Sequence, residues 1–122
     1  MTAAAALYRD PSVFAREREA VFRRAWQFLG REAEVSGPGD YLAETLAGFP
    51  VVAARDADGV LRAFHNVCRH RAGPLVEDGS GRCEGGEFVC RYHGWRYRLD
   101  GRLRNATGFG PAEGFDPRRF GL

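Results

Sequence analysis

Two stretches decide the fold of this chain: NVCRHR at residues 66–71 and FVCRYHGWRY at residues 88–97. Each stretch holds one cysteine and one histidine, Cys68 with His70 and Cys90 with His93, and 19 residues separate the two pairs. Thiolate and imidazole are donors that transition metals favour in proteins. All three histidines of the chain fall within 29 residues, so a metal site is the first interpretation to test.

Two kinds of metal group fit such a quartet. A [2Fe–2S] cluster needs two protein ligands on each iron, which gives Cys68 and Cys90 on one iron and His70 and His93 on the other. One tetrahedral zinc ion also accepts four such ligands. Zinc modules usually place two or more residues between paired ligands, however, and Cys68 and His70 have only one between them. We therefore expect the cluster, with a structural zinc module as the alternative.

The composition is that of one globular domain. A length of 122 residues allows one modest core, and the hydrophobic share of 44% and charged share of 28% are ordinary. No apolar run approaches the roughly 20 residues that cross a bilayer, and residues 1–8 lack the basic start of a signal peptide. We expect a cytoplasmic protein that binds no membrane. A net charge of +2 predicts no nucleic-acid partner.

Two residues of the ligand types lie outside the quartet. An odd number of cysteines without a signal peptide argues against a disulfide framework, and Cys83 is interpreted as a spare thiol in a Gly-rich loop. His65 is interpreted as a half-buried strand histidine.

Residues 11–29 are predicted to form an amphipathic helix that packs on the domain. Asp10 suits the N-cap, Pro11 suits the first helical position, and apolar residues recur on one face. Residues 67–75 and 77–86 are predicted loops, and residues 105–122 are predicted to be unpacked because Gly and Pro recur there. The predicted strands are residues 41–46, 49–55, 60–66, 87–92 and 95–99, with a return strand at 102–104.

The two stretches resemble the ligand boxes of Rieske non-haem iron oxygenases, the α subunits of bacterial ring-hydroxylating and related oxygenases. The likeness runs through most of the chain, because residues 14–26, 39–41 and 55–66 also resemble the N-terminal region of that family. The loop at residues 72–75 and the 19-residue gap resemble most the branch that acts on quaternary amines and small aromatics.

The resemblance implies a mainly β fold, a Rieske-type antiparallel β-sandwich of three small sheets with two cluster-binding hairpin loops and an N-terminal α-helix. It divides the chain into an N-terminal helical extension (1–35), a Rieske [2Fe–2S] domain (36–106) and a linker or tail toward a catalytic domain (107–122). It implies one [2Fe–2S] cluster per chain. A reductase or ferredoxin would donate the electron, and the mononuclear iron of an oxygenase catalytic domain, in this or another chain, would accept it.

Departures from related proteins refine this expectation. Respiratory Rieske proteins carry an extra cysteine in each box, and Arg71 and Tyr92 stand at those places, so no bridge is expected. Trp95 stands where the high-potential type has a serine that donates a hydrogen bond to the cluster. The loss of that hydrogen bond implies a reduction potential in the lower part of the Rieske range of roughly −150 to +300 mV. Arg91 replaces the usual proline.

The family's mononuclear iron uses two histidines and one carboxylate, and only His65 lies outside the quartet. This chain alone is therefore expected to have no catalytic residues and to hydroxylate nothing. The leading hypothesis is the electron-transfer domain of an oxygenase α subunit whose catalytic domain is missing here, and the alternative is a free-standing Rieske ferredoxin. Four arginines flank the quartet and are expected to attract an acidic electron donor: Arg69, Arg71, Arg91 and Arg96.

Overall fold

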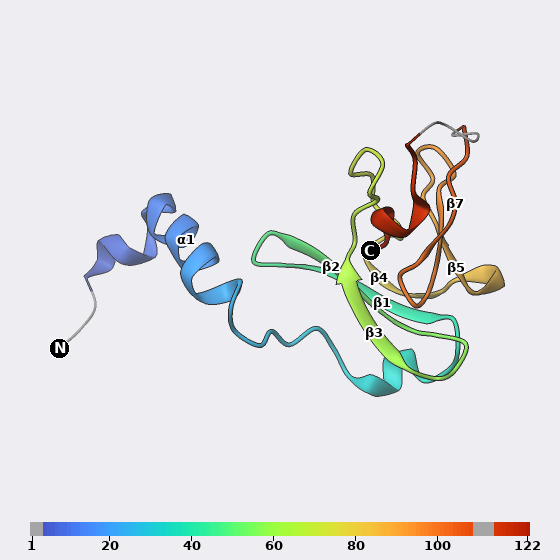
Figure 1. Cartoon of the computed structure of the whole chain (residues 1–122). Helices are drawn as coiled ribbons and strands as arrows, with labels where there is room; N and C mark the ends of the chain where they lie inside the picture. The colour runs from blue at the N-terminus through green and yellow to red at the C-terminus, as the bar shows by residue number, and fades with distance from the viewer. Residues whose placement is uncertain (1–3, 109–113) are drawn as a thin grey trace.

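The computed structural model describes residues 4–108 and 114–122, and two antiparallel sheets form its body (Figure 1). The larger sheet has the strand order β3-β2-β1-β4, and the smaller has the order β5-β6-β7. The mainly β antiparallel fold is confirmed, whereas the expected number of three sheets is wrong for the described residues. The strands are β1 Asp40–Leu46, β2 Phe49–Arg55, β3 Leu61–His65, β4 Gly79–Arg82, β5 Glu87–Val89, β6 Arg96–Arg98 and β7 Leu103–Asn105.

Strands with alternating apolar residues were predicted well, and the strand without them was missed. The prediction for residues 49–55 matches β2 at both ends, and Val52 and Ala54 are its buried alternate residues. The strand β4 lies inside the predicted loop 77–86 and pairs with β1. As an edge strand it needs only backbone hydrogen bonds. Gly81 lies under the Tyr41 ring, where a Cβ atom would be 2.7 Å from the phenol.

The core lies between the two sheets and contains large aromatic side chains. Phe88 and Tyr97 face each other across the β5–β6 ladder, and both are fully buried. Phe64 from β3 meets Phe88 edge-on, with ring centroids 6.2 Å apart. Its ring also covers Gly101, which has a φ of +90° and where a Cβ atom would lie 2.6 Å from that ring. Phe64 thereby links the larger sheet to the smaller one.

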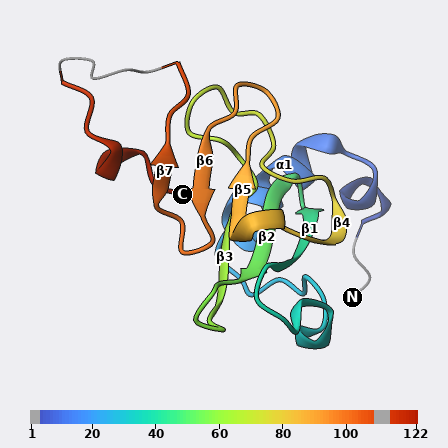
Figure 2. The same cartoon turned by 90° about the vertical axis from the view of Figure 1, so that its right-hand side faces the viewer.

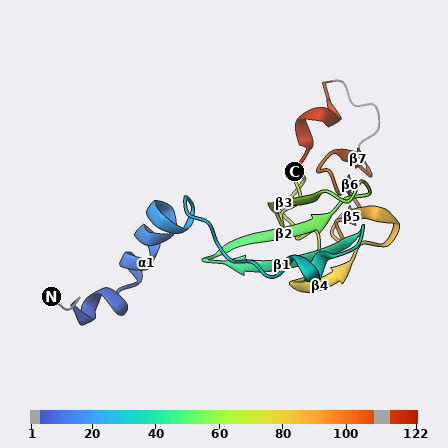
Figure 3. The same cartoon turned by 90° about the horizontal axis from the view of Figure 1, so that it is seen from below.

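The predicted N-terminal helix is shorter than expected and does not pack on the sheets. The helix α1, Pro11–Glu17, continues as one π-helical segment, Arg18–Phe22, and ends seven residues before the predicted Leu29. It lies to one side of the sheets (Figure 3), and its stripe residues Phe14 and Val21 are exposed. The periodicity identified a face that favours burial but did not specify its partner.

One side chain ties this helix to the larger sheet. The Arg18 guanidinium lies 4.4 Å from the centroid of the Phe49 ring and donates a hydrogen bond of 3.1 Å to the Gly48 carbonyl. Asp10 caps the helix as predicted, because its carboxylate accepts a hydrogen bond from the Ser12 N–H at 2.8 Å. No helix among residues 4–108 and 114–122 has the length and apolar character that a bilayer span requires.

The expectation that residues 105–122 are unpacked is wrong for residues 114–122. A short 3-10 helix, Pro117–Phe120, begins at Asp116, whose carboxylate accepts from the Arg118 N–H at 3.1 Å. Phe115, Phe120 and Leu122 pack against the core. Part of the predicted unpacked segment, residues 109–113, lies outside the described residues.

Candidate metal centre

The first of the two sequence boxes forms a tight loop after β3. Two backbone hydrogen bonds close it: the Cys68 N–H donates to the Gly73 carbonyl at 2.8 Å, and the Ala72 N–H donates to the Cys68 carbonyl at 3.0 Å. Ala72 has a φ of +55°, in the left-handed region. The loop therefore places Cys68 at its closed base and His70 near its tip.

The second box forms a loop between β5 and β6 with the same closure. The Cys90 N–H donates to the Trp95 carbonyl at 2.9 Å, and the Gly94 N–H donates to the Cys90 carbonyl at 2.8 Å. Gly94 has a φ of +72° and corresponds to Ala72 of the first loop. Both loops lie at the same end of the molecule (Figure 2). The two cysteines therefore occupy equivalent places in two matching loops.

The Asn66 side chain stabilises the first loop through hydrogen bonds to the backbone. This side chain is buried, and its amide oxygen accepts hydrogen bonds from the backbone N–H groups of Leu75 (2.9 Å) and Val76 (3.1 Å). Its amide nitrogen donates to the Val76 carbonyl at 2.9 Å. Asn66 thus joins the strand before the loop to the segment after it. Sequence reasoning quoted Asn66 as part of a motif but gave it no role, because its partners are backbone groups nine and ten residues away.

The structure brings the four predicted donor side chains together. Cys68 and Cys90 are both 2% exposed. Burial raises the pKa of the Cys90 thiol above its ordinary value, and the neighbouring Cys68 raises it further. The rings of His70 and His93 have centroids 4.7 Å apart, and both residues are half-buried. The two thiols thus neighbour each other, and so do the two imidazoles.

The backbones of the two loops also approach closely. A Cβ atom added to Gly73 in the first loop would lie 3.4 Å from the Cys90 sulfur of the second.

Burial lowers the pKa of His70, and His93 and Arg71 lower it further, so its ring is neutral near pH 7. The neutral imidazole is the form that binds a metal.

The chemistry of the donor set fits a [2Fe–2S] group. A cluster of two irons requires two protein ligands at each iron. The two loops supply two thiols and two imidazoles, which is the number and type of donors that such a group needs.

Two buried aromatic residues that follow the second loop support the first. The Trp95 indole stacks on the His70 ring with centroids 4.9 Å apart and planes 6° apart. The Tyr97 hydroxyl lies 3.3 Å from the Cys68 sulfur and accepts a hydrogen bond of 3.1 Å from the Arg69 N–H. The contact of the hydroxyl with Cys68 was missed, because the spacing does not show which ring reaches which loop.

The remaining cysteine and histidine lie outside this site. His65 is exposed at the end of β3, so the interpretation as a half-buried residue is wrong. Cys83 is 7% exposed, and burial raises the pKa of its thiol to about 11. All three cysteines are free thiols.

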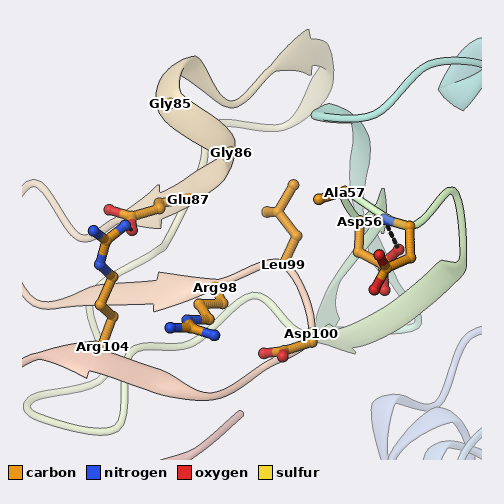
Figure 4. Close-up of a pocket in the computed structure, with 10 residues that line it drawn as sticks. Asp56, Ala57, Gly85, Gly86, Glu87, Arg98, Leu99, Asp100 and Arg104 are labelled. Atoms are coloured by element: carbon orange, nitrogen blue, oxygen red, sulfur yellow. Dashed lines mark hydrogen bonds and ion pairs between the residues drawn. The ribbon is translucent and has the colours of Figure 1, made fainter.

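A polar pocket of about 320 Å³ lies at the other end of the smaller sheet (Figure 4). It opens beside Glu87, the first residue of β5, whereas the second loop follows the last residue of that strand. Glu87 forms ion pairs with Arg104 and Arg96, and Asp56 accepts from Arg62 and two backbone N–H groups. The carboxylates of Glu87 and Asp56 are therefore satisfied by partners within the fold.

Comparison with protein families identifies the part of the chain that contains both loops. Residues 25–116 match the family described as the Rieske [2Fe-2S] domain. Two curated relatives are similar in sequence. The oxygenase subunit of glycine betaine monooxygenase from Chromohalobacter salexigens is 41% identical over 115 residues. The large oxygenase component of the naphthalene 1,2-dioxygenase system from Pseudomonas aeruginosa is 40% identical over 99 residues.

These relatives are much longer than this chain. The matched region covers 94% of this chain but 25% of the betaine enzyme, and 81% of this chain but 22% of the naphthalene enzyme. A solved structure, the apo form of a quaternary ammonium Rieske monooxygenase, superimposes with a TM-score of 0.90 and 36% identity. That match covers 98% of this chain and 34% of the other.

The role of Asn66 leads to a testable prediction. Replacing Asn66 with Ala removes three hydrogen bonds and leaves two N–H groups without their acceptor, so we expect the free energy of unfolding to fall by about 2–4 kcal/mol. Urea unfolding measures the loss, and hydrogen exchange at Leu75 and Val76 localises it. Asn105→Ala, at an exposed residue of β7, is the control; equal losses for the two alanine variants would contradict the role of Asn66.

Proposed function

The chain belongs to the family of Rieske [2Fe–2S] domains, and from this premise we propose that it transfers single electrons through one cluster bound by Cys68, His70, Cys90 and His93. The observation that supports the ligand set is the pair of matching loops, each of which contributes one buried thiol and one half-buried imidazole. Such a cluster, when bound, supplies a one-electron redox couple at a potential of roughly −150 to +300 mV.

The protein side chains would prepare this site for the cluster. The two thiols must lose their protons to bind iron, so binding is expected to release protons, and the raised pKa of Cys90 makes that release pH-dependent. The lowered pKa of His70 keeps its imidazole ready to bind near pH 7. Burial of the sulfur pair excludes water from that side, while the half-buried histidines lie nearer the surface.

We further propose that the electron passes to the mononuclear iron of an oxygenase catalytic domain. The chain spans about a quarter of the length of the curated relatives, and those relatives are oxygenase components. Inter-subunit electron transfer has been described for one solved relative, a quaternary ammonium Rieske monooxygenase. The acceptor iron would therefore lie in another part of the same polypeptide or in a neighbouring subunit.

The ligand set is tested with residues of the same type inside and outside it. We expect Cys68→Ala, Cys90→Ala, His70→Ala and His93→Ala each to abolish the visible spectrum and the stoichiometric iron and sulfide of the purified chain. Cys83→Ala and His65→Ala should keep the visible spectrum and the iron and sulfide content, because neither residue lies in the two loops. Iron and sulfide analysis with visible and electron paramagnetic resonance (EPR) spectra gives the readout. A colourless wild-type chain that contains one zinc ion would refute the proposal.

The Tyr97 hydroxyl is arranged to donate a hydrogen bond to the cluster sulfur ligand Cys68. Burial raises the pKa of Tyr97 well above its ordinary value, so the hydroxyl keeps its proton. Its oxygen already accepts from the Arg69 N–H, which leaves the proton for the sulfur 3.3 Å away. A donor at a thiolate ligand stabilises the more negative, reduced cluster and raises the potential.

Removal of this hydroxyl should lower the potential. A hydrogen bond of about 1 kcal/mol corresponds to roughly 40 mV for one electron, so Tyr97→Phe is expected to shift the midpoint downward by about that amount. Redox titration followed by EPR measures it. Tyr92→Phe also loses a hydroxyl beside a ligand histidine but from an exposed ring, and should leave the potential unchanged. A wild-type midpoint in Tyr97→Phe would show that the hydroxyl does not donate to the sulfur.

We also propose that the electron donor is a reductase or ferredoxin with an acidic docking surface. Arg69, Arg71 and Arg91 are exposed on the two loops that contain the ligands. Arg91 forms an ion pair with the exposed Glu77, a contact that water and salt weaken. The positive charge therefore surrounds the end of the molecule from which an electron would enter.

Charge near the loops should control the rate of reduction. At low ionic strength the double variant Arg69→Gln, Arg71→Gln is expected to accept electrons from a reduced acidic plant-type ferredoxin about tenfold more slowly than wild type. The difference should vanish in high salt, where the Debye length falls to a few ångströms. Stopped-flow absorbance measures both rates. Arg98→Gln with Arg102→Gln removes the same charge at the other end of β6, and an equal slowing there would contradict the docking proposal.

A further inference from the structure

The imidazole ring of His70 stacks on the indole ring of Trp95. The two rings are nearly parallel, with planes 6° apart and centroids at 4.9 Å, and Trp95 is only 1% exposed. His70 lies near the tip of the first loop, and its ring has the indole as a parallel neighbour. The position of the indole therefore bears on the orientation of the His70 ring.

Two phenyl rings from the end of the described chain hold that indole. Phe115 and Phe120 stand nearly perpendicular to Trp95, at 74° and 79°, with centroid distances of 6.1 and 6.0 Å. The two phenyl rings also stack on each other, with centroids 5.0 Å apart. Edge-to-face pairs of this kind contribute about 0.5–1.5 kcal/mol each beyond the area they bury.

The segment that contains these rings is itself anchored to the smaller sheet. The Leu122 N–H donates to the Gly101 carbonyl at 2.8 Å, at the turn between β6 and β7. The Asp116 carboxylate caps the 3-10 helix and forms an ion pair with Arg118. The segment is thus anchored to the smaller sheet at Leu122, and its helix is capped locally at Asp116.

We propose that Phe115 and Phe120 are positioning residues, which orient the ligand His70 by fixing Trp95. This inference rests on the proposed ligand role of His70. It extends the cluster-binding unit beyond residue 106 to residues 114–122, which were expected to be a linker. Displacement of this segment would then change the environment of the cluster although none of its residues lies in the two loops.

The test uses the full chain in a Trp26→Phe background, so that Trp95 is the only fluorescent indole. Trp26 is fully exposed and contributes to neither loop. We expect Phe115→Leu and Phe120→Leu to keep one cluster per chain by iron analysis. Each should shift the Trp95 emission to longer wavelength and shift the principal g values of the reduced cluster. Phe120→Tyr keeps the ring and should restore both signals. Phe28→Leu, at an 80% exposed ring, is the matched control and should change neither.

The outcomes separate this proposal from the proposed function. A wild-type chain without iron and sulfide refutes the cluster and therefore this inference with it. A wild-type cluster with unchanged emission and g values in both leucine variants overturns only the positioning role. The positioning role is also overturned if Phe120→Leu fails to fold while Phe115→Leu has wild-type spectra, since the phenyl rings would then only stabilise the fold.

Discussion

The structure depends on keeping two tight loops in contact, because these loops bring the four candidate metal-binding side chains to one end of the molecule (Figure 2). An imidazole is costly to bury without a polar partner, and a metal group binds thiols and imidazoles only when the fold brings them close together. The chain meets this constraint with the same arrangement in both loops. In each loop the backbone N–H and carbonyl groups of the cysteine both form hydrogen bonds to residues at the other end of that loop. The sheets below fix where the two loops begin, because one loop follows β3 and the other joins β5 to β6.

The first loop is also supported by residues that follow the second. Alternate residues of a strand point to the same side, so Trp95 and Tyr97 both face the core as the chain leaves the second loop. From there the indole supports His70, and the phenol contacts Cys68, both of which belong to the first loop. A change at Trp95 or Tyr97 therefore acts on the candidate ligands of the first loop. This cross-support explains why the two buried rings belong to the site as well as to the core.

The parts of the fold that follow local rules could be predicted from the sequence. Alternation located β2, and Gly59 supplied the positive φ of 79° that its turn requires. Contacts between distant segments could not be predicted in this way. The strand β4 has no apolar pattern, the partners of Asn66 are backbone atoms, and Phe115 and Phe120 lie in a Gly- and Pro-rich segment. The four candidate ligands were found because their residue types and spacing are local, whereas the side chains that position them are not.

The two matching loops reach the same conformation by different means. Gly94 adopts its positive φ without steric cost, so the second loop is favoured by its own sequence. Ala72 occupies the equivalent place at a φ of +55°, which costs an L-residue about 1 kcal/mol. The three hydrogen bonds of Asn66 join the two ends of the first loop and offset that cost. The first loop is therefore formed by its surroundings, and its candidate ligands Cys68 and His70 depend on contacts from Asn66, Trp95 and Tyr97.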